Sequence, residues 1–179
     1  GLEAAATARK FGVDVTLVEI EERILKRVAA KETSDYIRSL HISNGVKIKE
    51  AIGLDKLEIV GEKVVSASLT DGSDINVDFV IVGIGITPNS DLAEGANLKI
   101  NNGILINEKC QTSVSNIYAA GDCTSFKYKN ILVRLESVGN AIDQATTVAQ
   151  NIMKQNTIYT PKPWFWSDQY DLKLQIAGL

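Results

Sequence analysis

"GLEAAATARKFGVDVTLVE", residues 1–19, is the stretch that decides the fold. Its first part has the composition of a helix that ends near Gly12, and its second part, Val13 to Glu19, that of a short strand. A glycine that opens such a helix and an acidic residue that ends the next strand are typical of a Rossmann unit. We expect the stretch to be the helix and second strand of such a unit, whose first strand is missing from the sequence.

Two positions in this stretch match residues that help to bind the dinucleotide in a Rossmann unit. Gly1 fits the third glycine of the G-x-G-x-x-G turn, the one that allows a helix to pack closely on a strand. Glu19 fits the acidic residue that accepts hydrogen bonds from the adenosine ribose. Because the first two glycines are not in the sequence, an ordinary βαβ crossover remains an alternative.

The charges after Glu19 bear on the choice of nucleotide. Glu19, Glu21 and Glu22 would repel a 2′-phosphate, so the sequence favours NADH over NADPH. Arg23 and Arg27 work against this preference, since either could neutralise a phosphate. A solvated loop without a ligand is the alternative for all five residues.

Downstream, the hydrophobic pattern predicts further helices and strands. We expect a helix at residues 31–43, a strand at 46–50, a β-meander over 54–78 with turns at 60–62 and 71–72, and a covered parallel strand in "DFVIVGIG", residues 78–85. Pro88 marks the expected domain boundary. Beyond it we expect strands at 103–107 and 116–122, a helix at 137–153, a proline-broken aromatic linker at 159–169 and a final alternating strand at 170–179.

Composition narrows the function classes. The net charge of −3 gives no reason to expect nucleic acid or a membrane as a partner, and no apolar run approaches the ~20 residues that span a bilayer. The two cysteines, Cys110 and Cys123, have no metal-binding spacing and suit a reducing cytoplasm. With a single histidine, His41, we expect no metal site.

A polar pair follows an apolar run in "NIYAAGDCTSF", residues 116–126. We expect a buried strand that runs directly into Gly121 and Asp122. A buried carboxylate is costly unless a partner satisfies it, which indicates a ligand with hydroxyl groups. If that ligand is a dinucleotide with a polyol arm, Gly121 would allow its close approach and Asp122 would bind its hydroxyls.

The start of the helix expected at 137–153 is a second binding element. Ser137 is a candidate N-cap, and the backbone N–H groups near Val138 would have no partner within the helix. A helix N-terminus carries roughly half a positive charge, which would stabilise a reduced, anionic flavin ring bound at that end of the helix. An ordinary capped surface helix is the alternative.

Five stretches, in this order, resemble NADH-dependent ferredoxin reductases of the pyridine nucleotide–disulfide oxidoreductase superfamily, of the putidaredoxin reductase and rhodocoxin reductase type: "GLEAAATARKFGVDVTLVE", "VIVGIGITPN", "IYAAGDCT", "RLESVGNAIDQA" and "PWFWSDQYDLKLQIAGL". The resemblance implies an α/β fold. It implies a Rossmann-like, three-layer NAD-binding domain with a β-meander at residues 1–87. The C-terminal part of an FAD-binding domain would follow at 88–157, and the start of an α+β interface domain at 158–179.

The resemblance also implies roles for individual residues. Toward NAD, Glu3 would touch the nicotinamide carboxamide, Glu19 would bind the adenosine ribose with Arg27 nearby, and Gly83, Ile84 and Gly85 would line the cleft. For Glu3, a favourable interaction with its helix dipole is the alternative.

Toward FAD, the resemblance implies that Asp122, after Gly121, binds the ribityl chain and that Val138 contacts the flavin ring. Trp166 would lie beside the flavin where a [2Fe–2S] ferredoxin docks. An aromatic cluster that only joins two domains is the alternative for Trp166.

The function implied is hydride transfer from NADH to FAD, followed by single-electron transfer to a [2Fe–2S] ferredoxin. Since the flavin performs the chemistry, we nominate no catalytic acid or base. Two alternatives stay open: an NADH oxidase or disulfide reductase of the same superfamily, and a slow-turnover, NADH-binding signalling flavoprotein that resembles apoptosis-inducing factor. We expect the chain to be inactive by itself.

Overall fold

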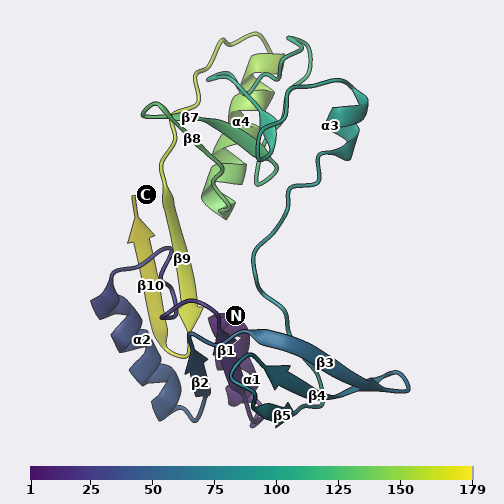
Figure 1. Ribbon diagram of the computed structural model, residues 1–179. Coiled ribbons are helices and arrows are strands. Elements are labelled where there is room, and N and C mark those ends of the chain that lie inside the picture. Colours follow the sequence, from purple (N-terminus) through teal and green to yellow (C-terminus); the bar gives the residue numbers. More distant parts are fainter. Residues whose placement is uncertain (179) are drawn as a thin grey trace. The chain divides into compact units, whose positions relative to one another are not determined.

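The computed structural model, which describes residues 1–178, divides into two compact units (Figure 1). The first unit comprises Gly1–Ile84 and Trp166–Ile176, and the second comprises Gly85–Phe165 with residues 177–178. Each unit contains both helices and strands, as the predicted α/β class requires.

The first unit is built on a βαβ arrangement. Strands β1 (Thr16–Glu19) and β2 (Lys47–Glu50) pair in parallel, and helix α2 (Lys31–Ser43) makes the connection between them. Helix α1 (Leu2–Lys10) precedes β1 and buries Ala5 and Ala6. The predicted strand at the end of the opening stretch is confirmed in a shorter form, and the predicted helix at 31–43 is confirmed.

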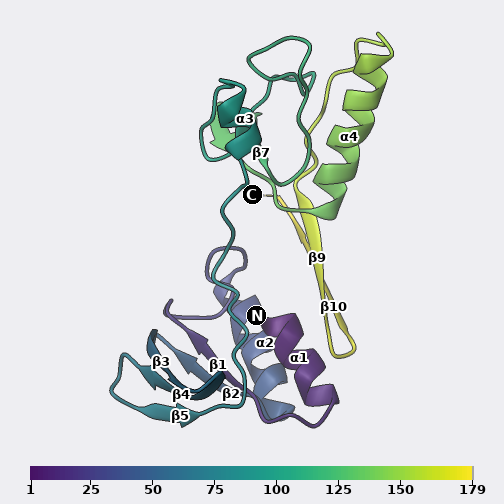
Figure 2. The same cartoon turned by 90° about the vertical axis from the view of Figure 1, so that its right-hand side faces the viewer.

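The predicted meander is also confirmed. Strands β3 (Leu54–Val60), β4 (Lys63–Leu69) and β5 (Asp74–Asn76) form an antiparallel sheet in that order. Figure 2 shows the β1–β2 sheet between α1 and α2 on one side and the meander on the other, which makes three layers in this unit.

The prediction of a linker at 159–169 is wrong for its second half. Strand β9 (Trp164–Gln169) lies there and pairs with β10 (Leu172–Ala177). The prolines at 161 and 163 precede the strand and therefore do not interrupt its ladder. Burial alternates along both strands, which is the period expected of a half-buried hairpin.

The prediction of a covered parallel strand at 78–85 is wrong. The segment forms no strand, and Ile81, Val82 and Ile84 are exposed. A strand needs a neighbour to take up its hydrogen bonds, and within residues 1–178 this segment pairs with neither β1 nor β2. The apolar pattern therefore identified a sequence that suits a buried strand, but no described strand is available to pair with it.

The second unit contains two helices and a small mixed sheet. Helix α3 (Asp91–Gly95) is short, and α4 (Val138–Ile152) is long and close to its predicted range. Strand β7 (Thr124–Tyr128) pairs with β6 (Ile104–Leu105) in parallel and with β8 (Ile131–Val133) antiparallel. The core of this unit contains Ile106, Cys110, Phe126 and Tyr159.

Polar side chains cover the buried face of α4. Asn140 accepts a hydrogen bond from the Tyr159 hydroxyl (2.5 Å), and Asn151 donates to the carbonyls of Lys109 (3.0 Å) and Thr157 (2.8 Å). Gln144 is fully buried between them. Hydrogen bonds to loops, rather than apolar contacts alone, therefore fix this helix in its unit.

The predicted strand at 116–122 is not formed. Tyr118 makes one isolated bridge to Gln111, and the following residues turn before β7 begins. Within residues 1–178, no helix is both long enough and apolar enough to cross a membrane.

Candidate functional site

The first candidate site lies at the start of α1. Gly1 is the N-cap of this helix, and Gly83 lies against it: a Cβ atom added to Gly83 would be 3.2 Å from the Gly1 backbone nitrogen. The structure thus places the predicted third glycine of the dinucleotide-binding turn next to a predicted cleft residue, and a side chain at Gly83 would crowd the Gly1 backbone. Ile84 is 91% exposed, and Gly85 has a φ of +104°, which favours glycine.

Glu3 lies in the first turn of α1, and its side chain is held by the C-terminal hairpin. The Ser167 hydroxyl on β9 donates to Glu3 Oε1 at 2.7 Å. Within the described part of the chain, Glu3 Oε2 has no partner. One carboxylate oxygen is therefore fixed while the other can accept a hydrogen bond from a ligand.

Glu19 ends β1, as predicted, and its side chain contacts the loop that follows the strand. Its Oε1 accepts a hydrogen bond from the Glu21 backbone N–H at 3.0 Å. Across the sheet Glu19 lies in register with Glu50 on β2, so two acidic residues end adjacent parallel strands.

Arg38 neutralises the second of these carboxylates. Its Nε and Nη2 donate to the two oxygens of Glu50 at 2.8 and 2.9 Å. Burial acts to raise the pKa of Glu50, but the hydrogen bonds from Arg38 and from the Ile24 N–H hold that pKa below its usual value. Glu19 is left as the acidic residue available at this end of the sheet.

The basic residues of the loop after β1 differ in whether their side chains have hydrogen-bond or ion-pair partners. Arg23 donates to the Ser34 hydroxyl, and Lys26 pairs with Glu21 at 2.9 Å. Arg27 is exposed, and among residues 1–178 its side chain has no ion-pair or hydrogen-bond partner. Of the two arginines predicted near Glu19, Arg27 is therefore the one free to contact a ligand.

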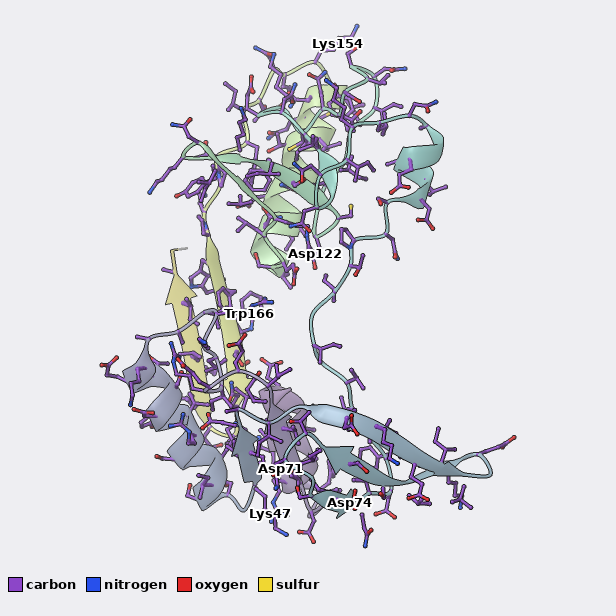
Figure 3. The ribbon with its side chains drawn as sticks, viewed as in Figure 1. Lys47, Asp71, Asp74, Asp122, Lys154 and Trp166 are labelled. Carbon is purple, nitrogen blue, oxygen red and sulfur yellow. The ribbon has the colours of Figure 1, made fainter. Side chains whose placement is uncertain are left out.

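The second candidate site lies in the second unit. Gly121 is buried with a φ of +89°, and its N–H donates to the Gln144 side-chain oxygen at 2.7 Å. Asp122 is exposed rather than buried (labelled in Figure 3), so the expectation of a buried carboxylate is wrong. The left-handed turn at Gly121 separates the buried glycine from the exposed Asp122.

The first turn of α4 adjoins this turn. A Cβ atom on Gly121 would lie 3.6 Å from the Ala141 side chain. Ser137 is the N-cap, as predicted, and accepts from the Asn140 N–H. The N–H groups of Val138 and Gly139 have no partner among the described residues. Two donors without a described partner therefore begin α4, next to the turn that is followed by the exposed Asp122.

Trp166 lies on β9, and 43% of its surface is exposed. Trp164, Trp166 and Asp168 alternate with more buried residues, so they share one face of the strand. An aromatic pair with a neighbouring carboxylate is thus exposed on this face.

Comparison with known proteins gives the family. The model of the pyridine nucleotide-disulphide oxidoreductase family matches residues 1–145, and the reductase C-terminal model matches residues 164–179. The chain belongs to the pyridine nucleotide-disulphide oxidoreductase family. The resemblance seen in the sequence is confirmed.

Relatives in this family include named ferredoxin reductases. Rhodocoxin reductase from Rhodococcus erythropolis is 41% identical over 181 residues, which cover all of this chain and 42% of that protein. A crystal structure of the ferredoxin reductase for the CYP199A2 system from Rhodopseudomonas palustris is 39% identical with a TM-score of 0.94, and covers 99% of this chain and 45% of its own. The chain thus spans under half the length of these relatives.

A solved complex is also similar. The covalent putidaredoxin reductase–putidaredoxin complex is 40% identical to this chain with a TM-score of 0.93, and the match covers 99% of this chain and 44% of that one. The α/β fold class is confirmed by these structures.

The two candidate sites fit the cofactors of a pyridine nucleotide-disulphide oxidoreductase. The close approach of Gly1 and Gly83 leaves backbone rather than side chain at the start of α1, which suits a pyrophosphate. The free N–H groups at the start of α4 suit the electron-rich edge of a flavin ring. The exposed carboxylate of Asp122 can accept from ribityl hydroxyls.

Two residues of these sites escaped the sequence analysis. Ser167 contacts Glu3 although 164 positions separate them, and no local pattern reports such a contact. Gln144 supports Gly121, and its Nε2 is buried with no partner among the described residues. The role of Gln144 could have been suspected from the sequence, because its helical spacing places it on the same face as Asn140 and Asn151.

Proposed function

We propose that the chain is the NAD-binding and flavin-contacting part of an NADH-dependent ferredoxin reductase. The observation that carries the proposal is its 41% identity to rhodocoxin reductase over the whole chain. In this enzyme a hydride passes from NADH to FAD, and electrons then pass singly to a [2Fe–2S] ferredoxin. Bound FAD supplies that redox chemistry, while the protein binds and orients.

In the proposed NAD site, Gly83, Ile84 and Gly85 line the cleft, and Gly1 is the third glycine of the dinucleotide-binding turn. The position of Gly83 supports this, because a Cβ atom at Gly83 would lie only 3.2 Å from the Gly1 nitrogen, on the backbone that a ligand would approach. Glu3 would accept a hydrogen bond from the carboxamide N–H₂ through its open oxygen.

The proposed preference for NADH rests on the end of β1. Glu19 would accept from both ribose hydroxyls, and a 2′-phosphate there would face Glu19 and the neighbouring acidic loop. Because Arg23 is bonded to Ser34 and Arg38 to Glu50, only Arg27 among these cations is free to offset that repulsion.

In the proposed FAD site, Asp122 binds the ribityl hydroxyls and the α4 start faces the flavin ring at Val138. Gly121 would allow the ligand to approach the backbone. The free N–H groups at Val138 and Gly139 support this role, since they would stabilise negative charge on the reduced ring. We propose that Trp166 lies at the face where the ferredoxin docks.

Two further proposals concern organisation and location. We propose the domain boundaries 1–87, 88–157 and 158–179 for the whole reductase. We also propose a cytoplasmic location, which the two free cysteines support because a reducing compartment keeps thiols unpaired.

The test is anaerobic reduction of the full-length flavoprotein. NADH should bleach the flavin absorbance rapidly and NADPH much more slowly, and the reduced protein should then reduce an added [2Fe–2S] ferredoxin in single-electron steps. Rapid bleaching by NADH with transfer only to disulfides or oxygen would refute the ferredoxin assignment. No bleaching by NADH would refute the reductase assignment itself.

A further inference from the structure

A continuous chain of hydrogen bonds in the first unit begins at Glu3. Ser167 Oγ lies 2.7 Å from Glu3 Oε1, and Gln169 Nε2 lies 2.9 Å from Ser167 Oγ. His41 Nε2 lies 2.8 Å from Gln169 Oε1, and the Tyr170 hydroxyl lies 3.2 Å from His41 Nδ1. The chain joins α1, α2 and the C-terminal hairpin.

The chemistry of these groups fixes the direction of every bond. An ionised glutamate only accepts, so Ser167 must use its one hydroxyl proton on Glu3. Ser167 then accepts from the amide N–H₂ of Gln169, whose oxygen accepts from His41. His41 therefore carries its proton on Nε2, and its Nδ1 accepts from the Tyr170 hydroxyl.

The far end of this chain is rigidly held. His41 and Gln169 are 0% and 1% exposed, and the rings of His41 and Tyr170 meet edge to face with centroids 5.1 Å apart. Lys10 on α1 also donates to the Tyr170 carbonyl at 3.3 Å. Ser167 is thus connected to a buried anchor on one side and to Glu3 on the other.

We propose that Ser167 is a positioning residue for the nicotinamide subsite. It holds Glu3 by Oε1, so that Oε2 is presented to the carboxamide of NADH. The inference rests on the proposed function, which assigns Glu3 to that carboxamide. Because Ser167 lies directly after Trp166, the same strand that presents the proposed ferredoxin contact also sets the geometry of the proposed hydride donor site.

The effect of Ser167 should appear in nucleotide affinity. A glutamate side chain that is already ordered loses less conformational freedom when the ligand binds. Ser167→Ala should therefore weaken binding of NAD⁺ by about three- to tenfold, and the KM for NADH should rise by a similar factor while kcat changes little.

The experiment uses calorimetric titration of NAD⁺ into the oxidised full-length flavoprotein. Ser68→Ala is the matched control, because Ser68 Oγ makes a similarly short bond, 2.6 Å, to the carboxylate of Asp74 in the meander (Asp74 is labelled in Figure 3). It should leave NAD⁺ affinity unchanged. Ser167→Thr keeps the hydroxyl and should restore most of the affinity.

A double-mutant cycle decides whether Ser167 acts through Glu3. In a Glu3→Ala background, Ser167→Ala should have no additional effect. Parent-like affinity in Ser167→Ala, while Glu3→Ala weakens binding, would overturn the inference and leave the proposed function intact. Unchanged affinity in Glu3→Ala would also overturn it. A parent flavoprotein that NADH fails to reduce would instead overturn the proposed function.

Discussion

Replacing Gly121 by alanine tests whether the flavin approaches this turn. The added Cβ would lie 3.6 Å from the Ala141 side chain, an ordinary contact, so no clash opposes the change within the unit. The φ of +89° would nevertheless cost an alanine about 1–2 kcal/mol. If that strain were expressed entirely as lost cofactor affinity, FAD would bind about 5- to 30-fold more weakly.

If FAD approaches this turn as proposed, we expect a larger loss than this, above about 30-fold, because the methyl group would also occupy the space next to the backbone that the ligand needs. Gly72→Ala is the matched control. Gly72 has a φ of +81° in the turn between β4 and β5, and an added Cβ would meet no atom within 4 Å. It should reduce stability by a similar amount and leave FAD affinity unchanged.

The assay is titration of FAD into the apoprotein of each full-length variant, followed by flavin fluorescence, with thermal unfolding of the apoproteins to measure strain. Equal FAD affinity for Gly121→Ala and Gly72→Ala would refute the placement of flavin at this turn. A loss within the 5- to 30-fold range would mean that strain alone explains the effect.

Three further predictions address other parts of the chain. Trp166→Ala should slow electron delivery to ferredoxin at least severalfold while stopped-flow flavin reduction by NADH stays unchanged; equal slowing of both steps would contradict a docking role. Burial lowers the pKa of His41 from its ordinary 6.5, so the unfolded state takes up the proton first as pH falls. The melting temperature should therefore fall more steeply from pH 7 to pH 5.5 than in His41→Asn, and parallel slopes would show that another group is responsible. Burial raises the pKa of the Cys110 thiol to about 11, so iodoacetamide at pH 8 should leave its peptide unmodified in the native protein and modify it after unfolding.

The local sequence pattern was sufficient to predict an element where the hydrogen bonds of that element are made by residues close to it in the sequence. Helix α2 and helix α4 were predicted within a residue or so, and the meander was predicted because its turns at residues 61 and 72 carry glycines in a left-handed conformation. The Ser137 cap was predicted for the same reason. Each of these features is decided by residues a few positions apart.

The local sequence pattern failed where the structure of a residue depends on a distant partner or on exposure to solvent. The apolar segment at 78–85 has strand composition, but it lies exposed because no described strand pairs with it. Asp122 follows an apolar run, yet a single left-handed residue turns it to the surface. The sequence analysis assigned His41 no structural role, but it shares the buried face of α2 with Ser34 and Ile37. That spacing of three and four residues was visible in the sequence.

The sequence nominated single residues of the candidate site, but it could not show which of them lie together. Gly1 was predicted as the third glycine of the dinucleotide-binding turn and Gly83 as a cleft residue, and the structure adds that Gly83 lies against the Gly1 backbone. The hydrogen bond from Ser167 to Glu3 joins the two ends of the chain, so it depends on tertiary packing alone.

The amide contacts of α4 have a mechanical consequence. Apolar contacts tolerate sliding, whereas a hydrogen bond weakens when its atoms shift by a few tenths of an ångström, and a one-residue slip advances a helix by about 1.5 Å. The hydrogen bonds of three side chains therefore hold α4 in one position along its axis: those of Asn140, Gln144 and Asn151. A substitution at Asn151, about 20 Å along the helix from Val138, would free the far end of α4 and so disturb the helix start at which we propose that the flavin ring binds.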